Sequence, residues 1–322
     1  MKTSQIGEAQ SSKVELDFPP ELDVRFYRGR NPNMSGWTDE QVTKHFVDHG
    51  QSEGRIGSVG ATRRHWMTAF PETLHALEIG PFCNPFLRGS NIKYLDLMDS
   101  EGLQARWDAV ERHEPRTAPP IHFVSPTGDL SMVDEVFDLV FSSHCIEHQI
   151  DLVAHLRGVS ETLQPDGVYF LFIPDKRYCF DHFLPETTIA DVLDAVGRPR
   201  DRHTLRDVIL HRAKTTHNQV ARHWQGDHAD PGYGTDNANR VARALSAYLY
   251  GEFVDMHAWQ FIPERFRSIA ETLFQLGLTD LQPTRVYNTP RDRAEFVAVL
   301  KKTSTRVTPQ AEQLLALRYE AK

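Results

Sequence analysis

Cysteine is scarce in this sequence. Only three occur in 322 residues, at positions 83, 145 and 179, with no paired or metal-type spacing. This scarcity argues against a disulfide framework and fits a reducing compartment, so we expect a cytoplasmic protein.

Long apolar runs are missing as well. No stretch approaches the length that spans a bilayer, and residues 1–13 lack the basic-then-apolar plan of a signal peptide. We therefore expect no membrane span.

The chain also lacks an excess of basic charge. Its 44 acidic and 36 basic residues give a net charge of −8, which disfavours nucleic acid as a partner. With 40% apolar and 25% charged residues, a chain of this length can bury a full core. We expect a globular protein with one large domain and additions.

The clearest positive feature is an apolar run that stops in a Gly-Pro turn, Leu77-Glu78-Ile79-Gly80-Pro81. A strand that ends in glycine beside an acid is where an open α/β sheet commonly holds a nucleotide-like ligand. Gly80 would let the backbone approach a ligand closely, while Glu78 offers a carboxylate to hydroxyls or an amine. The Gly-x-Gly-x-x-Gly fingerprint of NAD-linked enzymes is absent.

Strand-like and helix-like stretches alternate from Leu74 onward. This pattern predicts an α/β fold, a doubly wound and mostly parallel sheet with helices on both faces. The expected strands are 76–79, 92–97, 121–124, 137–142 and 168–173, followed by a closing antiparallel pair at 284–287 and 295–300. A helix with apolar residues from Leu152 to Leu163 is expected to end in the turn Pro165-Asp166-Gly167.

The chain divides into four expected parts. After a mobile tail comes a small helical module, which a capping box at Thr38-Asp39-Glu40-Gln41 opens and Gly50 stops. In the main domain, a His-rich helical insertion follows the fifth strand, where it would cover the ligand crevice as a lid. The expected bounds are tail 1–18, module 19–60, main domain 61–305 with insertion 175–259, and C-terminal helix 306–322.

The order of motifs resembles that of the seven-stranded, Rossmann-like class I S-adenosylmethionine-dependent methyltransferases, over roughly residues 72–302. Residues 77–81 resemble the family's first motif, and residues 94–96 resemble the second, with its acid at the strand end. Residues 128–130 match the adenine-side acidic motif, and residues 143–148 match the His-x-x-Glu-His segment of a type 11-like subgroup. Leu163-Gln164-Pro165-Asp166-Gly167 is similar to that subgroup's Leu-x-Pro-Gly-Gly. Where the family has a second and third glycine, this chain has Pro81, Phe82 and Asn84.

The resemblance implies S-adenosylmethionine as cofactor. Asp96 could accept two hydrogen bonds from the ribose hydroxyls. Asp129 could accept one from the adenine amino group, with Leu130 packed on the ring. Turn capping is the alternative for both acids. The full set of expected cofactor-binding residues is Glu78, Gly80, Pro81, Asn84, Asp96, Leu97, Asp129, Leu130 and Ser143.

Methyl transfer from a sulfonium is an in-line displacement, which needs a base when the acceptor is a hydroxyl. His257 is the preferred base because it lies between apolar residues just before a helix, although it could equally be a satisfied core histidine. The expected catalytic residues are His257, His144, Asp175 and His182. The expected substrate-binding residues are Glu147, His148, Lys176, Arg177 and His228.

The segment His144–His148 also resembles the Glu-x-x-Glu-His of metal-dependent small-RNA and ubiquinone-pathway O-methyltransferases. His144 replaces the first glutamate, and imidazole suits zinc, iron or manganese better than magnesium. We expect no bound metal, with His144, Glu147 and His148 as the alternative set.

The N-terminal pattern Phe-Tyr, Asn-Pro-Asn and His-Phe resembles a module of bacterial surface-glycan biosynthesis proteins. The expected function is therefore O-methylation of a sugar or glycan precursor, with a small-molecule or glycan substrate and a homo-oligomer or a glycan-synthesis complex as the assembly. The alternatives are O- or N-methylation of another small metabolite, and a non-catalytic scaffold subunit.

Overall fold

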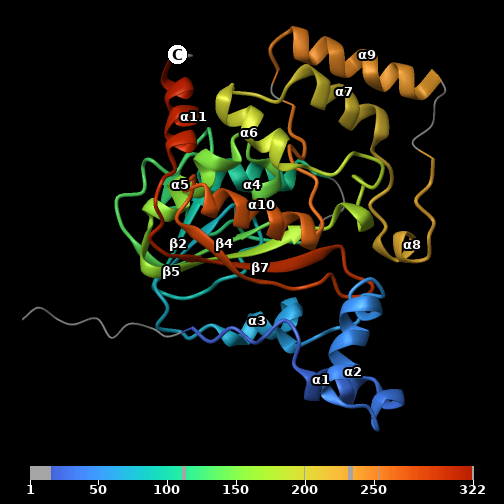
Figure 1. Ribbon diagram of the computed structural model, residues 1–322. Coiled ribbons are helices and arrows are strands. Elements are labelled where there is room, and N and C mark those ends of the chain that lie inside the picture. The colour runs from blue at the N-terminus through green and yellow to red at the C-terminus, as the bar shows by residue number, and fades with distance from the viewer. Residues whose placement is uncertain (1–15, 111–113, 199, 231–234, 253, 321–322) are drawn as a thin grey trace, which may run out of the picture.

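The computed structural model describes residues 16–110, 114–198, 200–230, 235–252 and 254–320. These residues form a seven-stranded sheet with the order β3-β2-β1-β4-β5-β7-β6 (Figure 1). The strands are β1 Ala76–Ile79, β2 Ile92–Asp96, β3 Phe123–Val124, β4 Phe137–Ser143, β5 Leu163–Pro174, β6 Leu281–Val286 and β7 Glu295–Lys302.

The first five strands run parallel, and β7 runs antiparallel to both β5 and β6. The expected α/β sheet and its closing antiparallel pair are therefore confirmed. The central strands form here because they are continuous apolar runs, which a sheet buried on both faces requires. Their side chains alternate between two separate cores, so that Tyr169 and Leu171 face one and Phe170 and Phe172 face the other.

Helices α5, α6, α10 and α11 cover the face on which Tyr169 lies. The helices in chain order are α1 Val24–Arg30, α2 Asp39–His45, α3 Arg63–Ala69, α4 Ser100–Asp108, α5 Leu152–Glu161, α6 Ile189–Gly197, α7 Leu205–Lys214, α8 Val220–Trp224, α9 Thr235–Leu249, α10 Pro263–Gln275 and α11 Pro309–Glu320. Among the described residues, no helix combines the length and the apolar character that crossing a membrane requires.

A segment that precedes β1 covers the opposite face. The connection from β1 to β2 contains no helix that could cover it. Trp66 of α3 is buried, and its ring lies 4.7 Å from that of Phe170. The ring centroid of Phe18 lies 5.5 Å from that of Trp66, and Leu16 packs against the same core. Leu16 and Phe18 were expected in a mobile tail and instead pack on the sheet; residues 1–15 lie outside the described residues.

Two expected helix ends differ from the structure. The capping box at Thr38 is present, but α2 ends at His45 and continues as a π-helical turn, Phe46–Gly50. Helix α5 ends at Glu161, so Pro165-Asp166-Gly167 lies in the exposed start of β5 and not at the helix end. Asp166 adopts φ 64°, a left-handed conformation that aspartate tolerates.

The insertion after β5 has two parts. Helix α6 belongs to the main core through Val192 and Val196. Helices α7 and α9 pack on each other at one side of the molecule (Figure 1), around Val208, Ala244 and Met256. Only the part from α7 onward therefore has a small core of its own.

An ion pair ties α3 to the sheet. The guanidinium of Arg63 makes two hydrogen bonds to the Glu295 carboxylate at the start of β7, of 2.6 and 2.7 Å. His144 Nε2 is 2.7 Å from the same carboxylate. Burial alone would raise the pKa of Glu295, but the bonds from Arg63 and His144 outweigh it and lower this pKa to about 2.

The depressed pKa of Glu295 predicts a contribution to stability that acid removes. The pKa falls from 4.5 to about 2 on folding, so the stabilisation is fully present above pH 4.5 and is lost as the pH falls through 2. The shift corresponds to about 3 kcal/mol. We expect Glu295→Gln to lower the free energy of unfolding by about this amount at pH 7, and by roughly half of it at pH 3.

Urea denaturation at the two pH values measures this difference. Glu72→Gln, which alters an exposed carboxylate before β1, is the control and should change neither value. An equal loss for Glu295→Gln at both pH values would contradict the assignment.

Candidate functional site

The strand order reverses between β1 and β4, and a crevice opens at the carboxyl ends of such strands. Gly80 follows β1 with φ 68°, a conformation that other residues adopt only with strain. A Cβ atom at this position would lie 3.4 Å from the sulfur of Cys145, which follows β4. Glycine at position 80 therefore keeps this crevice open.

The loop after Gly80 is held by the carboxylate of Glu78. One oxygen accepts a hydrogen bond from the backbone N–H of Phe86 and the other accepts one from Leu87, both of 2.8 Å. Glu78 is 2% exposed, and burial raises its pKa to about 7 although these two bonds oppose the shift. Both oxygens of Glu78 therefore serve the loop, and its expected contact with the cofactor stays a prediction.

Asp96, at the end of β2, holds the same loop at its other end. Its oxygens accept hydrogen bonds from the backbone N–H groups of Phe82, at 3.0 Å, and Leu97, at 2.7 Å. Burial raises the pKa of this carboxyl group. Each carboxylate oxygen can accept a second bond, so Asp96 can still bind hydroxyls. In the loop itself, Pro81 is buried and Asn84 is exposed.

The adenine-side residues differ from expectation. Asp129 accepts hydrogen bonds from the hydroxyls of Ser131 and Thr127, which lower its pKa to about 2, so its carboxylate organises its own turn. Leu130 is 5% exposed within the core and cannot pack on a ligand ring. Leu97 is 43% exposed beside Gly128 and offers the apolar surface there.

Ser143 and His144 belong to the ion pair of Arg63 and Glu295. The Ser143 hydroxyl accepts a 2.7 Å bond from the Arg63 guanidinium, and its expected role at the cofactor stays a prediction. Burial would lower the pKa of His144, but the bond to Glu295 and the nearby Glu147 raise it. Its Nδ1 atom lies 3.9 Å from a Glu147 oxygen.

The carboxylate of Glu147 is the centre of the candidate site. It is fully buried, and neither oxygen has a hydrogen-bond partner among the described residues. One oxygen lies 3.8 Å from Nε2 of His148 and 3.8 Å from Nε2 of His257. The backbone carbonyl of Glu147 accepts a 2.7 Å bond from Ala258, which brings the end of the insertion over β4.

Two further carboxylates orient these imidazoles. Nδ1 of His257 is 2.5 Å from Asp181, and Nδ1 of His148 is 3.0 Å from Asp255. Because an ionised carboxylate only accepts, Nδ1 carries the proton in each ring and Nε2 faces Glu147. Burial would lower the pKa of His148, but its bond to Asp255 raises it. The sequence singled out neither aspartate, although Asp255 lies only two residues before His257.

A cavity of about 330 Å³ adjoins this cluster. Its walls include His148, Asp255 and His257 on one side and His211 and Arg212 of α7 on the other. The insertion thus supplies part of the space next to the buried carboxylate.

The same cluster offers metal ligands. Glu147, His148 and His257 each present one ligand atom, and the three atoms lie within 4.8 Å of one another. This set differs from the expected alternative, because His257 takes the place of His144, which Glu295 binds.

Three expected residues after β5 have structural partners instead. Asp175 is fully buried, and its carboxylate accepts bonds from the Arg177 guanidinium and from the Thr289 hydroxyl. The Lys176 ammonium is 8% exposed and donates to the His182 carbonyl at 2.8 Å. The catalytic role of Asp175 and the substrate contacts of Lys176 and Arg177 are corrected, because these groups fix the segment that leaves the sheet.

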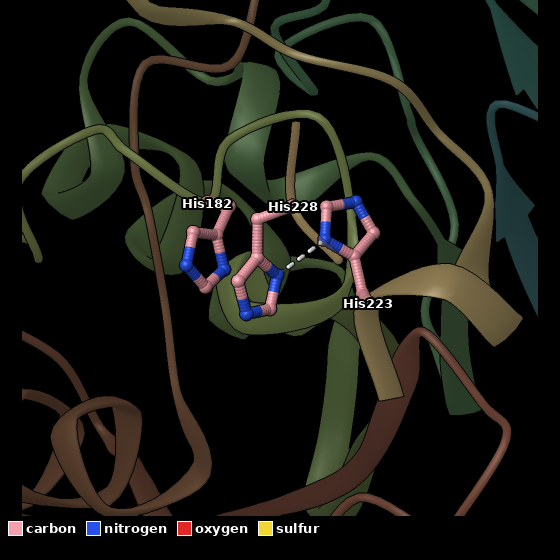
Figure 2. Close-up of side chains that lie close together, drawn as sticks. All are labelled: His182, His223 and His228. Atoms are coloured by element: carbon pink, nitrogen blue, oxygen red, sulfur yellow. Dashed lines mark hydrogen bonds between the residues drawn. The ribbon is translucent and has the colours of Figure 1, made fainter. Parts of the chain in front are cut away.

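His182 and His228 do not join the Glu147 cluster. They form a second group with His223 in the insertion (Figure 2). Burial lowers the pKa of all three imidazoles.

Comparison with solved structures finds remote likenesses. A magnesium protoporphyrin IX methyltransferase from Synechocystis PCC 6803 with bound SAH is 14% identical, over 87% of this chain and 95% of that chain, with a TM-score of 0.36. An S-adenosylmethionine-dependent methyltransferase from Mesorhizobium loti is 17% identical, over 74% and 94%, with a TM-score of 0.30. A complex of a Haloferax volcanii methyltransferase activator with a putative methyltransferase is 12% identical, over 84% of this chain and 99% of that chain, with a TM-score of 0.37. Similarities at these TM-scores do not assign a function to this chain.

A comparison with family models is more informative. No curated protein matches the chain, but residues 81–171 match the model of a methyltransferase domain. The matched stretch runs from the loop after Gly80 into β5, and it contains both Asp96 and Glu147. The chain therefore carries a methyltransferase domain, an enzyme class for which S-adenosylmethionine is the cofactor.

Proposed function

We propose that this protein transfers the methyl group of S-adenosylmethionine to a hydroxyl of a sugar or glycan precursor, with His257 as general base. The observation that carries the proposal is the arrangement of His257, which Asp181 holds at 2.5 Å on one ring nitrogen while the other lies 3.8 Å from Glu147, next to the cavity that His257 lines. A base of this kind is needed because a neutral hydroxyl is a weak nucleophile.

The cofactor end of the proposal uses three features of the crevice. Asp96 would accept hydrogen bonds from the ribose hydroxyls through its remaining lone pairs. Leu97 would pack on the adenine, since its side chain is exposed beside that acid. Gly80 leaves the space that the amino-acid end and the sulfonium require.

In the transfer step, S-adenosylmethionine held by Asp96 and Leu97 would supply the methyl group to the acceptor oxygen, and its sulfur would leave as that of S-adenosylhomocysteine. The hydroxyl proton goes to Nε2 of His257. The resulting imidazolium is stabilised by Asp181 at Nδ1 and by the charge of Glu147, 3.8 Å from Nε2.

The buried carboxylate of Glu147 supports a substrate rich in hydroxyls. A buried polar group without a partner is costly, so a ligand that donates to it gains more than an ordinary hydrogen bond. The resemblance of the N-terminal module to those of glycan-biosynthesis proteins points to the same class of substrate.

Calorimetry tests the cofactor site. We expect Asp96→Ala to weaken binding of S-adenosylmethionine and S-adenosylhomocysteine roughly 10- to 100-fold, because hydrogen bonds to a charged group contribute about 1.5–3 kcal/mol each. Asp134 is exposed and lies in the connection between β3 and β4, so the control variant Asp134→Ala should leave both affinities unchanged. Failure of the intact protein to bind either ligand would contradict the proposal.

Turnover with labelled cofactor and a panel of nucleotide sugars and glycans tests the base. We expect His257→Ala to lower kcat about 10²- to 10⁴-fold, with the cofactor affinity nearly unchanged. Asp181→Asn should lower kcat too, because its amide can hold the ring in the wrong tautomer. His49→Ala, an exposed change in the N-terminal module, serves as control. Unaltered turnover of His257→Ala would remove it as the base.

A further inference from the structure

Three imidazoles from separate parts of the insertion converge outside the crevice. His182 follows the 3₁₀ turn Lys176–Tyr178, His223 lies in α8, and His228 lies in the loop after α8 (Figure 2). Each ring offers a nitrogen, and the three nitrogens lie within 4.8 Å of one another. None of the three takes part in the proposed transfer step.

The hydrogen bonds of His223 fix which nitrogen is free to bind a ligand. Its Nε2 atom is 3.0 Å from the carbonyl oxygen of His217, which can only accept, so Nε2 carries the proton. In the neutral ring, Nδ1 then carries the lone pair. This atom accepts a hydrogen bond from Nδ1 of His228, 3.0 Å away, as the dashed line in Figure 2 shows, so an ion that binds both nitrogens takes the place of this proton.

The same reasoning applies to His182. Its Nδ1 atom is 2.8 Å from the carbonyl oxygen of Arg177 and donates to it, which leaves the lone pair on Nε2. A backbone carbonyl on the second nitrogen is the usual support of a histidine that binds a metal. The backbone is held too, since Lys176 donates to the carbonyl of His182 and Thr216 to that of His228.

We propose that His182, His223 and His228 bind a zinc-type divalent ion. Imidazole nitrogens suit zinc and its transition-metal neighbours, while the absence of a carboxylate from the set disfavours calcium and magnesium. Two nitrogens about 2.1 Å from one ion are roughly 3.0–3.4 Å apart at ordinary angles, which the 3.0 Å separation of His223 and His228 satisfies. Water would fill the remaining position, since His182 and His228 are partly exposed.

One ring has to move for the ion to enter. The rings of His182 and His228 are stacked, with centroids 3.5 Å apart and planes 10° apart, so their lone pairs lie in nearly parallel planes and cannot meet at one ion. His182 turns about its side-chain bonds to bring Nε2 toward the ion, and in doing so it exchanges the hydrogen bond from Nδ1 to the Arg177 carbonyl for a bond to the ion. Rotamer changes of a partly exposed side chain are fast and need no backbone shift.

The ion would join the segment leaving β5 to the segment around α8. The same two segments already meet where the rings of Tyr178 and Trp224 stack at 3.8 Å. Asp181, which orients His257, is the residue next to His182. The site therefore stabilises the part of the insertion that supports the candidate base, yet it depends on neither the acceptor nor the methyl transfer.

The full chain, stripped with a chelator and dialysed, is titrated with Zn²⁺ by calorimetry and with Co²⁺ by visible absorption. We expect binding that His223→Ala or His228→Ala weakens at least tenfold. Zn²⁺ should raise the Tm of the intact protein but not of these variants. With chelator present, circular dichroism should show that the variants are folded, which separates loss of a ligand from loss of structure.

His217→Ala is the matched control. The ring of His217 packs on His223, but both its nitrogens are bound, Nε2 to the Asp227 carbonyl and Nδ1 to the Gln219 N–H. The alanine keeps the carbonyl that His223 needs, so metal binding should persist. Absence of Zn²⁺ binding by the intact chain would overturn the proposal. So would binding that survives His223→Ala and is lost in His148→Ala, because that result places the ion at the Glu147 cluster.

Discussion

The candidate site depends on the backbone carbonyl of Glu147, which accepts hydrogen bonds from the N–H groups of Ala258 and Trp259. It joins the returning end of a long insertion to the turn that follows β4, and so brings together groups more than a hundred residues apart in the sequence. Asp181 and Asp255 then orient the two imidazoles, and the unpartnered carboxylate stays between them. The backbone bonds to Glu147 and the bond from His257 to Asp181 together fix His257 beside this carboxylate.

Much of the fold could be predicted from the sequence because local signals agreed with the global arrangement. Apolar runs bounded by turn residues gave the strands their positions, and glycine after β1 marked the point where the strand order reverses. The proline-rich continuation was harder to interpret. The structure shows a loop whose backbone N–H groups are held by the carboxylates of Glu78 and Asp96 beside the crevice.

The candidate site was predicted only in part, for physical reasons that particular residues illustrate. His257 was singled out from its apolar neighbours, and it does reach Glu147 and His148. Asp175 was misjudged because the sequence does not show that the guanidinium of Arg177, two positions later, binds its carboxylate. His182 was misjudged because adjacent side chains diverge: Asp181 turns toward His257, while His182 turns toward His223 and His228.

The packing of Phe18 and Trp66 on the sheet has a consequence for how this protein can be divided. A fragment that began at β1 would keep all seven strands but expose Phe170 and its aromatic neighbours, which these residues now cover. A large apolar patch of that kind promotes aggregation. The segment before the sheet is thus part of the folding unit, and a transplant of the catalytic fold into another protein would have to begin before Phe18.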